Sequence, residues 1–341
     1  MQWTEILSAF VTAALISYLA TPFVKLIAIK TNFLDQPRST KVHAHPKPLL
    51  GGVAIWAAFL IAIVSNPSLV SSPFIIPLIA GAFVLLLIGL IDDRMGMEPN
   101  MKLLGQFLAA MVVIKSGLRV EFLNNYYLNV IFTYLWIIGI TNAFNLLDNM
   151  DGLSSGIAVI SGVFFGIISW LDHQSAVAGI SFALAGSSLG FLKHNFPRSK
   201  IFMGDTGSLV IGYILASIAI VGKWKTYVWS TSLMIPILVL GYPIFDTTLV
   251  IVIRLLERRS VFDGGRDHSS HRLALLGLKK KRAVYIIFMV CCMLGLAALL
   301  LTRVSPLVGI GIGILAIAGM IGLGIRLSIV KTSREGRKKI R

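Results

Sequence analysis

Charged side chains are scarce in this sequence, and their scarcity excludes most classes of soluble protein. Asp, Glu, Lys and Arg together make up 13% of the 341 residues, whereas hydrophobic residues make up 56%. The charged fraction is about half that of an average soluble domain. The composition therefore indicates a membrane protein before any single segment is considered.

Cysteine is also nearly missing. Cys291 and Cys292 are adjacent within an apolar run, a placement that predicts neither a disulfide framework nor a metal site. Basic residues are missing as well from MQWTE, which precedes the first apolar run. This start predicts a retained helix and not a cleaved signal peptide.

Acidic residues are few compared with basic ones. The chain has 15 Asp and Glu against 31 Lys and Arg, which gives a formal net charge of +16. A nucleic-acid-binding protein can carry such an excess. In a membrane protein, however, Lys and Arg gather in cytoplasmic loops. We expect this second explanation, and no nucleic-acid partner, because the basic residues follow the loops.

Long apolar runs predict an all-α polytopic membrane protein with eleven transmembrane helices. The ninth run contains Pro236 and Pro243, which predict a kinked helix with an extension beyond the membrane. The expected spans are residues 6–29, 49–65, 73–91, 101–115, 128–141, 156–171, 175–192, 207–222, 226–253, 283–302 and 304–327.

The basic residues predict the orientation of these spans. One alternate set of loops, with the tail from 326, holds 25 of the 31 Lys and Arg, the opposite set holds 5, and Lys25 lies near the inner end of the first span. The positive-inside rule then places the N-terminus outside and the C-terminus in the cytoplasm. The expected cytoplasmic loops are 30–48, 92–102, 142–155, 193–206 and 254–282.

Two of these loops bring acids to the ends of spans. GLIDDR places Asp92 and Asp93 at the inner end of the third span, and FMGDTGS places Asp205 between two glycines. Taken alone, the pair is best explained as an acidic helix end, but acids at a helix C-terminus oppose the helix dipole, which adds weight to a function. Asp205 can be an N-cap or a ligand of a hard cation.

A third loop, NAFNLLDNMDGL, is polar between two apolar runs. Asn142, Asn145, Asp148 and Asp151 recur every three residues, so they lie on one side of a helical or 3₁₀ segment. Each such group costs roughly 2–3 kcal/mol or more at membrane depth unless it is paired or faces water. The pattern predicts a water-filled inner cavity, with a structural polar seam as the alternative.

The loop 254–282 and the span before it add basic and acidic groups. His268 and His271 are three residues apart, with Arg272 beside them, and Asp246 lies within the ninth span. Two histidines without a third ligand nearby favour phosphate or nucleotide recognition over zinc. An acid within a membrane span is a candidate functional residue, although it can also stabilise a kink.

The last apolar run has the glycine content of a dinucleotide-binding loop without its context. No strand precedes GIGIGIL, and no acid follows in a βαβ unit. Ser305, Gly309 and Gly313 are spaced by four residues, which instead predicts a face for close helix packing. This face is also consistent with a homodimer.

Four ordered motifs resemble those of a known enzyme family. GLIDDR, NAFNLLDNMDGL, FMGDTGS and DHSSHRL, among about eleven helices, are similar to the motifs of polyprenyl-phosphate N-acetylhexosamine-1-phosphate transferases. PRSTKVHAHPKPLLGG also resembles the first cytoplasmic loop of that family. The resemblance is strongest to the enzymes that start O-antigen, enterobacterial common antigen and wall teichoic acid lipids. It is weaker to the UDP-MurNAc-pentapeptide phosphotransferase of peptidoglycan synthesis, because DHSSH replaces consecutive histidines.

The resemblance implies an activity at the cell membrane for a single transmembrane catalytic domain, residues 1–341. Undecaprenyl phosphate would attack a UDP-N-acetylhexosamine, with GlcNAc as the expected sugar, and UMP would leave. The implied cofactor is Mg²⁺, with Mn²⁺ as an alternative, held mainly by Asp205. Asp92 or Asp93 would orient or deprotonate the lipid phosphate while the other assists at the metal.

The remaining polar residues would hold the donor on the same resemblance. Asn142, Asn145, Asp148 and Asp151 would bind the nucleotide-sugar and its diphosphate, and Lys41 the uridine end. His268, His271 and Arg272 would close over the sugar or its phosphate. A different class, an ion-coupled transporter, also uses polar groups at broken helices. The placement of the polar residues at one membrane face, and not at the midplane, favours the transferase.

Overall fold

A computed structural model describes residues 2–36, 46–224, 233–261, 265 and 267–330 of the chain. The chain divides into two compact units, residues 1–223 and 224–341, and each is described by itself. Both are built almost entirely from helices, so the predicted all-α class is confirmed.

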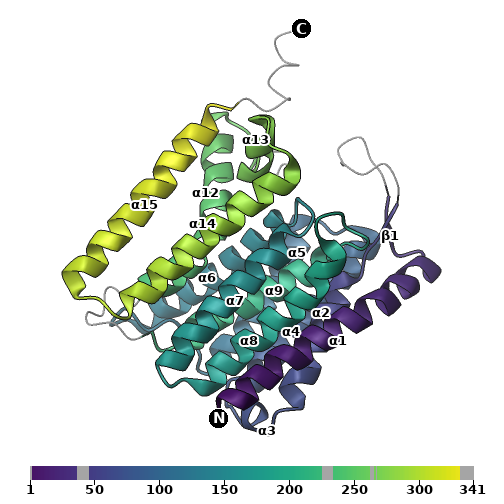
Figure 1. Ribbon diagram of the computed structural model, residues 1–341, viewed down its shortest axis with the longest axis horizontal. Coiled ribbons are helices and arrows are strands. Elements are labelled where there is room, and N and C mark those ends of the chain that lie inside the picture. Colours follow the sequence, from purple (N-terminus) through teal and green to yellow (C-terminus); the bar gives the residue numbers. More distant parts are fainter. Residues whose placement is uncertain (1, 37–45, 225–232, 262–264, 266, 331–341) are drawn as a thin grey trace. The chain divides into compact units, whose positions relative to one another are not determined.

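The first unit is a bundle of long helices that run roughly along one common direction (Figure 1). A two-stranded antiparallel ladder, β1 (Leu34–Asp35) with β2 (Lys47–Pro48), lies between the first two helices. The helices are α1 (Trp3–Lys30), α2 (Gly51–Val64), α3 (Pro67–Val70), α4 (Ile75–Met95), α5 (Pro99–Lys115), α6 (Tyr126–Leu147), α7 (Leu153–Leu171), α8 (Ser175–Asn195) and α9 (Gly204–Val221).

Small residues let these helices approach closely. A Cβ atom added at Gly190 of α8 would lie 2.3 Å from the Ala14 carbonyl oxygen of α1. At Gly212 of α9, the added atom would lie 2.8 Å from the Cα atom of Thr141 on α6. Small side chains at helix contacts are typical of membrane proteins, where packing drives association. Helix α9 is thus buried along nearly its whole length.

The second unit contains the helix break that the two prolines predict. Helix α11 (Met234–Val239) ends one residue before α12 (Gly241–Leu256) begins, with Leu240 between them. Pro243 lies in the first turn of α12, where its missing N–H costs no helical hydrogen bond. The unit continues with α13 (Ser269–Leu275), α14 (Lys280–Leu301) and α15 (Pro306–Ser328).

The predicted packing face of the last helix is present in part. Gly309 and Gly313 are buried within the second unit. A Cβ atom at Gly313 would lie 1.8 Å from the terminal methyl carbon of Met234, so the flexible end of this side chain packs directly on the glycine. Ser305 is instead the exposed N-cap residue of α15.

The helices support a membrane protein. Among the described residues, eight helices are long and apolar enough to span a bilayer, and α2 is a shorter apolar helix. They are α1, α4, α6, α7, α8, α9, α14 and α15. Helices occur within all eleven predicted spans. The count of eleven spans, the single catalytic domain and the orientation of the termini stay predictions.

Candidate active site

Two aspartates at the end of α4 face different partners. Asp93 caps the start of α9: one of its oxygens accepts the backbone N–H of Asp205 at 2.8 Å. Its other oxygen accepts the backbone N–H and the hydroxyl of Thr206, at 3.1 and 2.6 Å. These bonds satisfy N–H groups that the first turn of a helix leaves unpaired. Asp93 therefore ties α4 to the residue that follows Gly204.

Glycines make this approach of α4 and α9 possible. Gly204 has a φ of +72°, a conformation that costs other residues a steric penalty. A Cβ atom there would also lie 2.3 Å from a carboxylate oxygen of Asp93. At Gly89 of α4, an added Cβ would lie 2.4 Å from the Cα atom of Thr206. The glycines on both helices thus set the position of Asp205.

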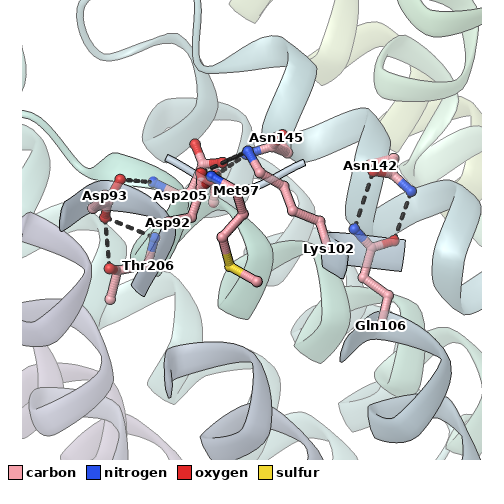
Figure 2. Close-up of polar contacts among 10 residues, drawn as sticks. Asp92, Asp93, Met97, Lys102, Gln106, Asn142, Asn145, Asp205 and Thr206 are labelled. Carbon is pink, nitrogen blue, oxygen red and sulfur yellow. Dashed lines mark hydrogen bonds and ion pairs between the residues drawn. The ribbon is translucent and has the colours of Figure 1, made fainter. Parts of the chain in front are cut away.

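The second aspartate of the pair, Asp92, shares a cation with Asp205. The Lys102 ammonium, from the first turn of α5, lies 2.6 Å from an oxygen of Asp92 and 2.6 Å from an oxygen of Asp205. The other oxygen of Asp92 accepts the Met97 backbone N–H at 2.6 Å. Figure 2 shows the three acids and Lys102 together. As predicted for adjacent helix residues, Asp92 and Asp93 point to different groups.

The three carboxylates can form a metal site. Asp92, Asp93 and Asp205 each offer an oxygen within 4.8 Å of the others, and all three residues are half-buried. Carboxylate oxygens are the ligands of hard cations such as Mg²⁺. Among the residues that the structure describes, these three acids face the single ammonium of Lys102, and a divalent cation would neutralise the excess of negative charge. The residues present therefore fit the predicted metal.

The polar row of residues 142–151 divides between two structures. Asn142 and Asn145 lie on the last turns of α6, whereas Asp148 is the C-cap residue and Asp151 lies in the turn before α7. Gly152 has a φ of +73° and allows the chain to reverse, as the sequence suggests.

The two asparagines have different surroundings. Asn142 pairs reciprocally with Gln106 of α5, through bonds of 2.6 and 3.1 Å between their carboxamides, as Figure 2 shows. Asn145 donates to the Ser208 hydroxyl at 3.0 Å and also reaches the Asp205 carboxylate. Asn142 thus joins α5 to α6, and Asn145 lies at the acid cluster.

Asp148 and Asp151 are the two acids of the turn between α6 and α7. Asp151 accepts the Ser199 backbone N–H at 3.1 Å. Burial, and after it the nearby carboxylates of Asp205, Asp93 and Asp151, together raise the pKa of Asp148 to about 8. Such a shift indicates that Asp148 shares the negative field of the cluster.

A segment before α9 joins the loop between α1 and α2 to the turn that holds Asp151. The Phe202 N–H donates to the Pro48 carbonyl at 2.8 Å, and the Gly51 N–H donates to the Phe202 carbonyl at 3.0 Å. The Lys47 ammonium donates to the Ser199 carbonyl and lies 5.5 Å from the centre of the Phe202 ring. Lys41, from the same loop, lies outside the described residues.

In the second unit, the predicted histidines lie at the start of α13. His268 is its N-cap residue, and its Nδ1 atom lies 2.8 Å from Asp246 of α12. His271 is half-buried one turn further on. Arg272 is 2% exposed and donates to the carbonyls of Asp267, Leu327 and Val330. The structure thus places the Arg272 guanidinium at the C-terminal end of α15.

Sequence reasoning missed Lys102, Thr206 and Ser208. Lys102 was a lone basic residue at a helix start, and only the packing of α5 against α4 shows that it reaches two acids. Thr206 and Ser208 had a weak signal, since both lie within the conspicuous FMGDTGS segment. Polar side chains next to a cation ligand commonly orient it.

Comparisons with known proteins bear on the whole chain. A model described as glycosyl transferase family 4 matches residues 75–223. The probable undecaprenyl-phosphate N-acetylglucosaminyl 1-phosphate transferase of Bacillus subtilis (strain 168) is 34% identical over 306 residues, which cover 87% of this chain and 85% of the relative. The chain belongs to glycosyl transferase family 4. The predicted family is therefore confirmed.

Two further relatives carry similar names. The decaprenyl-phosphate N-acetylglucosaminephosphotransferase of Mycobacterium leprae (strain TN) is 33% identical, over 82% of this chain and 79% of the relative. The undecaprenyl-phosphate alpha-N-acetylglucosaminyl 1-phosphate transferase of Thermotoga maritima is 30% identical, over 82% and 94%. The segment matched by the family 4 model contains the entire acid cluster, whereas the His268 region lies beyond it.

Proposed function

We propose that the protein transfers N-acetylglucosamine-1-phosphate from UDP-N-acetylglucosamine to undecaprenyl phosphate and releases UMP. The observation that carries the proposal is the acid cluster of Asp92, Asp93 and Asp205 at helix ends of a membrane bundle. All three relatives are named for N-acetylglucosamine and a polyprenyl phosphate. Their names favour this reaction over transfer of a muramoyl pentapeptide, and membership in a transferase family decides against an ion-coupled transporter.

The reaction is a displacement at phosphorus. An oxygen of the lipid phosphate forms a bond to the sugar-bearing phosphorus, and the bond from that phosphorus to the bridging oxygen breaks, so that the electron pair leaves with UMP. Such a reaction depends chiefly on positioning and on neutralising charge. A phosphate monoester is largely dianionic at neutral pH because its second pKa is near 6. The acceptor therefore requires little help from a base.

Asp205 and Asp92 are the residues that we assign to Mg²⁺, with Mn²⁺ as an alternative. The bound cation would neutralise the charge of the diphosphate. Asp93 keeps its three bonds to the start of α9 and positions Asp205. Lys102 lies between the same two carboxylates, so cation binding requires its ammonium to leave at least one of them. The released ammonium would then be available to neutralise charge on the phosphates of the donor.

The other predicted residues keep the donor roles that the sequence suggests. Asn145 reaches the Asp205 carboxylate, and the charges of Asp205 and Asp93 act on Asp148; we assign both residues, together with Asp151, to the nucleotide-sugar. Asn142 supports the end of α6 through Gln106. Lys41, His268 and His271 are assigned to the uridine end and the sugar. For Arg272 we propose a supporting role, because its donors are engaged by backbone carbonyls.

We propose direct attack without a covalent enzyme intermediate. The lipid phosphate is itself an anionic nucleophile, and holding both substrates at one site supplies proximity. In the alternative, Asp151 or Asp92 would first take the sugar-phosphate. Enzyme stripped of lipid should then move labelled UMP into UDP-N-acetylglucosamine. Direct attack predicts no exchange until polyprenyl phosphate is added.

The location of the site follows from the distribution of charge. We propose that the acid cluster faces the cytoplasm at the cell membrane, with the N-terminus outside, because 25 of the 31 basic residues lie in loops on its side or in the tail. A homodimer through the last helix is part of the same proposal. A cytoplasm-specific reporter fused after Arg341 should be active, and inactive within residues 66–72.

Release of UMP tests the proposed function. Purified protein should release UMP from UDP-N-acetylglucosamine only when polyprenyl phosphate and Mg²⁺ are both present. UDP-N-acetylgalactosamine and UDP-MurNAc-pentapeptide are the competing donors in the same assay. Equal or faster turnover of the pentapeptide donor would contradict the proposed substrate, and no release with any donor would contradict the reaction itself.

A further inference from the structure

A run of basic residues precedes the apolar part of α14 in the second unit. All four side chains of the run are exposed, and they are Lys279, Lys280, Lys281 and Arg282. Within the described residues, no acid lies in the first turn of α14, and no carboxylate forms an ion pair with the run. Cations at the start of a helix oppose its dipole. The run therefore concentrates positive charge where the helix itself does not favour it.

Exposed leucines lie directly before the basic run. Leu275 is the last residue of α13 and Leu276 is its C-cap residue, and they are 53% and 59% exposed. Gly277 follows with a φ of +90°, so the chain turns there between α13 and α14. Large apolar side chains that stay exposed beside cations are typical of segments that lie on a membrane surface.

The position of the run in α14 places it at the edge of the bilayer. Helix α14 is long and apolar enough to span a membrane, so the cations that precede its apolar part lie at one membrane surface. Tyr285, within the first two turns, is half-exposed, and its ring centre lies 5.7 Å from the Lys281 ammonium. A tyrosine at this depth is typical of the aromatic belt of membrane proteins.

The end of α15 brings the same combination of side chains to this surface. Arg272 of α13 donates to the Leu327 carbonyl at 3.1 Å, so the last turn of α15 lies beside α13. Arg326 in that turn is exposed, and so are the neighbouring apolar residues Ile325 and Ile329. Two helix ends and the turn after α13 thus form one basic and apolar surface within the second unit.

We propose that the interfacial segment, residues 275–282, binds the headgroups of anionic phospholipids in the bilayer. Its leucines would enter the boundary between headgroups and acyl chains, while its cations meet lipid phosphates. Zwitterionic lipids offer the same apolar boundary without net negative charge, so the charge of the segment selects the anionic ones. This binding ties α13, the helix that begins after His268, to the membrane surface. It requires neither the acid cluster nor the proposed function.

A simpler explanation is that the basic run only orients α14 during membrane insertion. Orientation uses the charges alone and gives no reason for Leu275 and Leu276 to be exposed. It also predicts no choice among lipids by the folded protein. Lipid selectivity at the segment therefore separates the two explanations.

A photo-crosslink locates the lipid without removing any charge. Leu276→benzoylphenylalanine places a light-activated ketone within the segment, in full-length protein reconstituted into vesicles of equal phosphatidylglycerol and phosphatidylcholine. Mass spectrometry of the products should show at least about fivefold more phosphatidylglycerol, the effect of a single basic residue near an anionic lipid. Leu315→benzoylphenylalanine, on an exposed face of α15, is the matched control and should capture both lipids equally.

Neutralising the run measures what the charges contribute. The variant replaces each of its four cations by Gln, as Lys279→Gln, Lys280→Gln, Lys281→Gln and Arg282→Gln. In neutral detergent, its affinity for phosphatidylglycerol by native mass spectrometry should fall by at least about 20-fold, because each cation contributes about fivefold. The affinity for phosphatidylcholine should stay unchanged. High salt should weaken phosphatidylglycerol binding to the parent by screening the same charges.

Two further variants separate charge from apolar contact. Replacing the three lysines by arginine keeps every charge and should keep the parental affinity for phosphatidylglycerol. Leu275→Ser together with Leu276→Ser also keeps every charge, yet it should weaken phosphatidylglycerol binding by at least about fivefold, because apolar surface is then no longer buried.

Each outcome bears on the proposal. Equal capture of the two phospholipids at position 276 overturns it, as does parental affinity for phosphatidylglycerol in a folded variant without the four cations. If that variant does not fold, the crosslink alone decides. Capture of added polyprenyl phosphate in preference to phosphatidylglycerol would assign the segment to the acceptor and overturn the proposal. Failure to release UMP would contradict only the proposed function, because these lipid measurements need no turnover.

Discussion

Asp205 and Asp246 are carboxylates within helices of the same apolar chain, and their charges are compensated in opposite ways. Asp246 is fully buried and receives donors from Ser269 and His268 at both oxygens. Asp205 is 27% exposed and shares one Lys102 ammonium with Asp92. Within the described residues, the second unit thus satisfies Asp246 internally, whereas Asp92 and Asp205 of the first unit share the ammonium of Lys102.

This difference separates a positioning acid from a ligand-binding acid. A buried carboxylate with a complete set of donors gains little from a further ligand, because its desolvation is already compensated. Clustered carboxylates repel one another, and a divalent cation relieves the repulsion. We therefore expect substitutions in the first cluster to change cation binding, and substitutions of Asp246 to disturb the hydrogen bonds that hold His268 and Ser269.

The largest effect is expected for Asp205→Asn. The substitution keeps the size of the side chain but removes an anionic cation ligand. UMP release should fall by at least about 10³-fold, because charge neutralisation supplies most of the catalysis. The thermal stabilisation that Mg²⁺ gives to the parent should also disappear.

Asp172→Asn, at the end of α7 and outside the cluster, is the control for that change and should keep both properties. Near-parental turnover of Asp205→Asn at ordinary Mg²⁺ concentrations would remove Asp205 from the metal site. It would also break the comparison with Asp246.

Lys102→Met should have the next largest effect. The variant keeps the apolar stem but leaves Asp92 and Asp205 without their shared ammonium. In EDTA its melting temperature should fall below that of the parent, and added Mg²⁺ should raise it by more than it raises the parent. Turnover should fall about 100-fold if the ammonium also neutralises phosphate charge.

Lys115→Met removes an exposed charge at the other end of α5 and should leave melting temperature and turnover unchanged. Equal stabilisation of Lys102→Met and the parent by Mg²⁺ would contradict the exchange of ammonium for metal.

The sequence allowed the three acids to be grouped, but not their division of labour. Asp92, Asp93 and Asp205 were predictable because acids at helix ends within an apolar chain require a partner. The roles of Asp93 and Lys102 depend on how α4 packs against α9 and α5, which no local pattern specifies. In the same way, Arg272 looked suited to phosphate, yet it meets carbonyls of α15 that lie more than fifty residues away in the chain.

The helices show the same limit. Apolar runs predicted where helices occur, and Pro236 with Pro243 predicted the break between α11 and α12. The period-three row from Asn142 to Asp151 was expected to form one polar side. It instead divides between the end of α6 and a turn, because Asp148 ends the helix and Gly152 reverses the chain.

A smaller effect is expected for Thr206→Val, which tests Asp93 as a positioning acid. The hydroxyl of Thr206 donates to Asp93 at 2.6 Å, and the two backbone bonds to Asp93 remain after the change. Loss of a hydrogen bond to a charged group costs about 1.5–3 kcal/mol. The melting temperature should fall, and a higher Mg²⁺ concentration should be needed for half-maximal turnover.

Thr206→Ser keeps the hydroxyl and is the matched control, which should retain the Mg²⁺ requirement of the parent. If both variants show the parental requirement, Asp93 does not depend on this bond to hold Asp205 in place.

The smallest effect concerns Asp148 and appears only in the pH dependence of stability. Its pKa in the folded protein is raised from 3.8 to about 8, so the folded state holds a proton that the unfolded state has lost. Stability from this group is complete below the lower value and is lost as the pH rises toward the higher one. In EDTA, Asp148→Asn should therefore lessen the fall in melting temperature between pH 5 and pH 8, whereas Asp172→Asn should keep the parental fall.

Saturating Mg²⁺ should shrink the difference between the parent and Asp148→Asn, because a cation at the cluster favours the ionised form of Asp148. A parental slope in Asp148→Asn would show that the negative field of the cluster does not extend to this turn, and the contrast with the internally compensated Asp246 would then be confined to Asp92, Asp93 and Asp205.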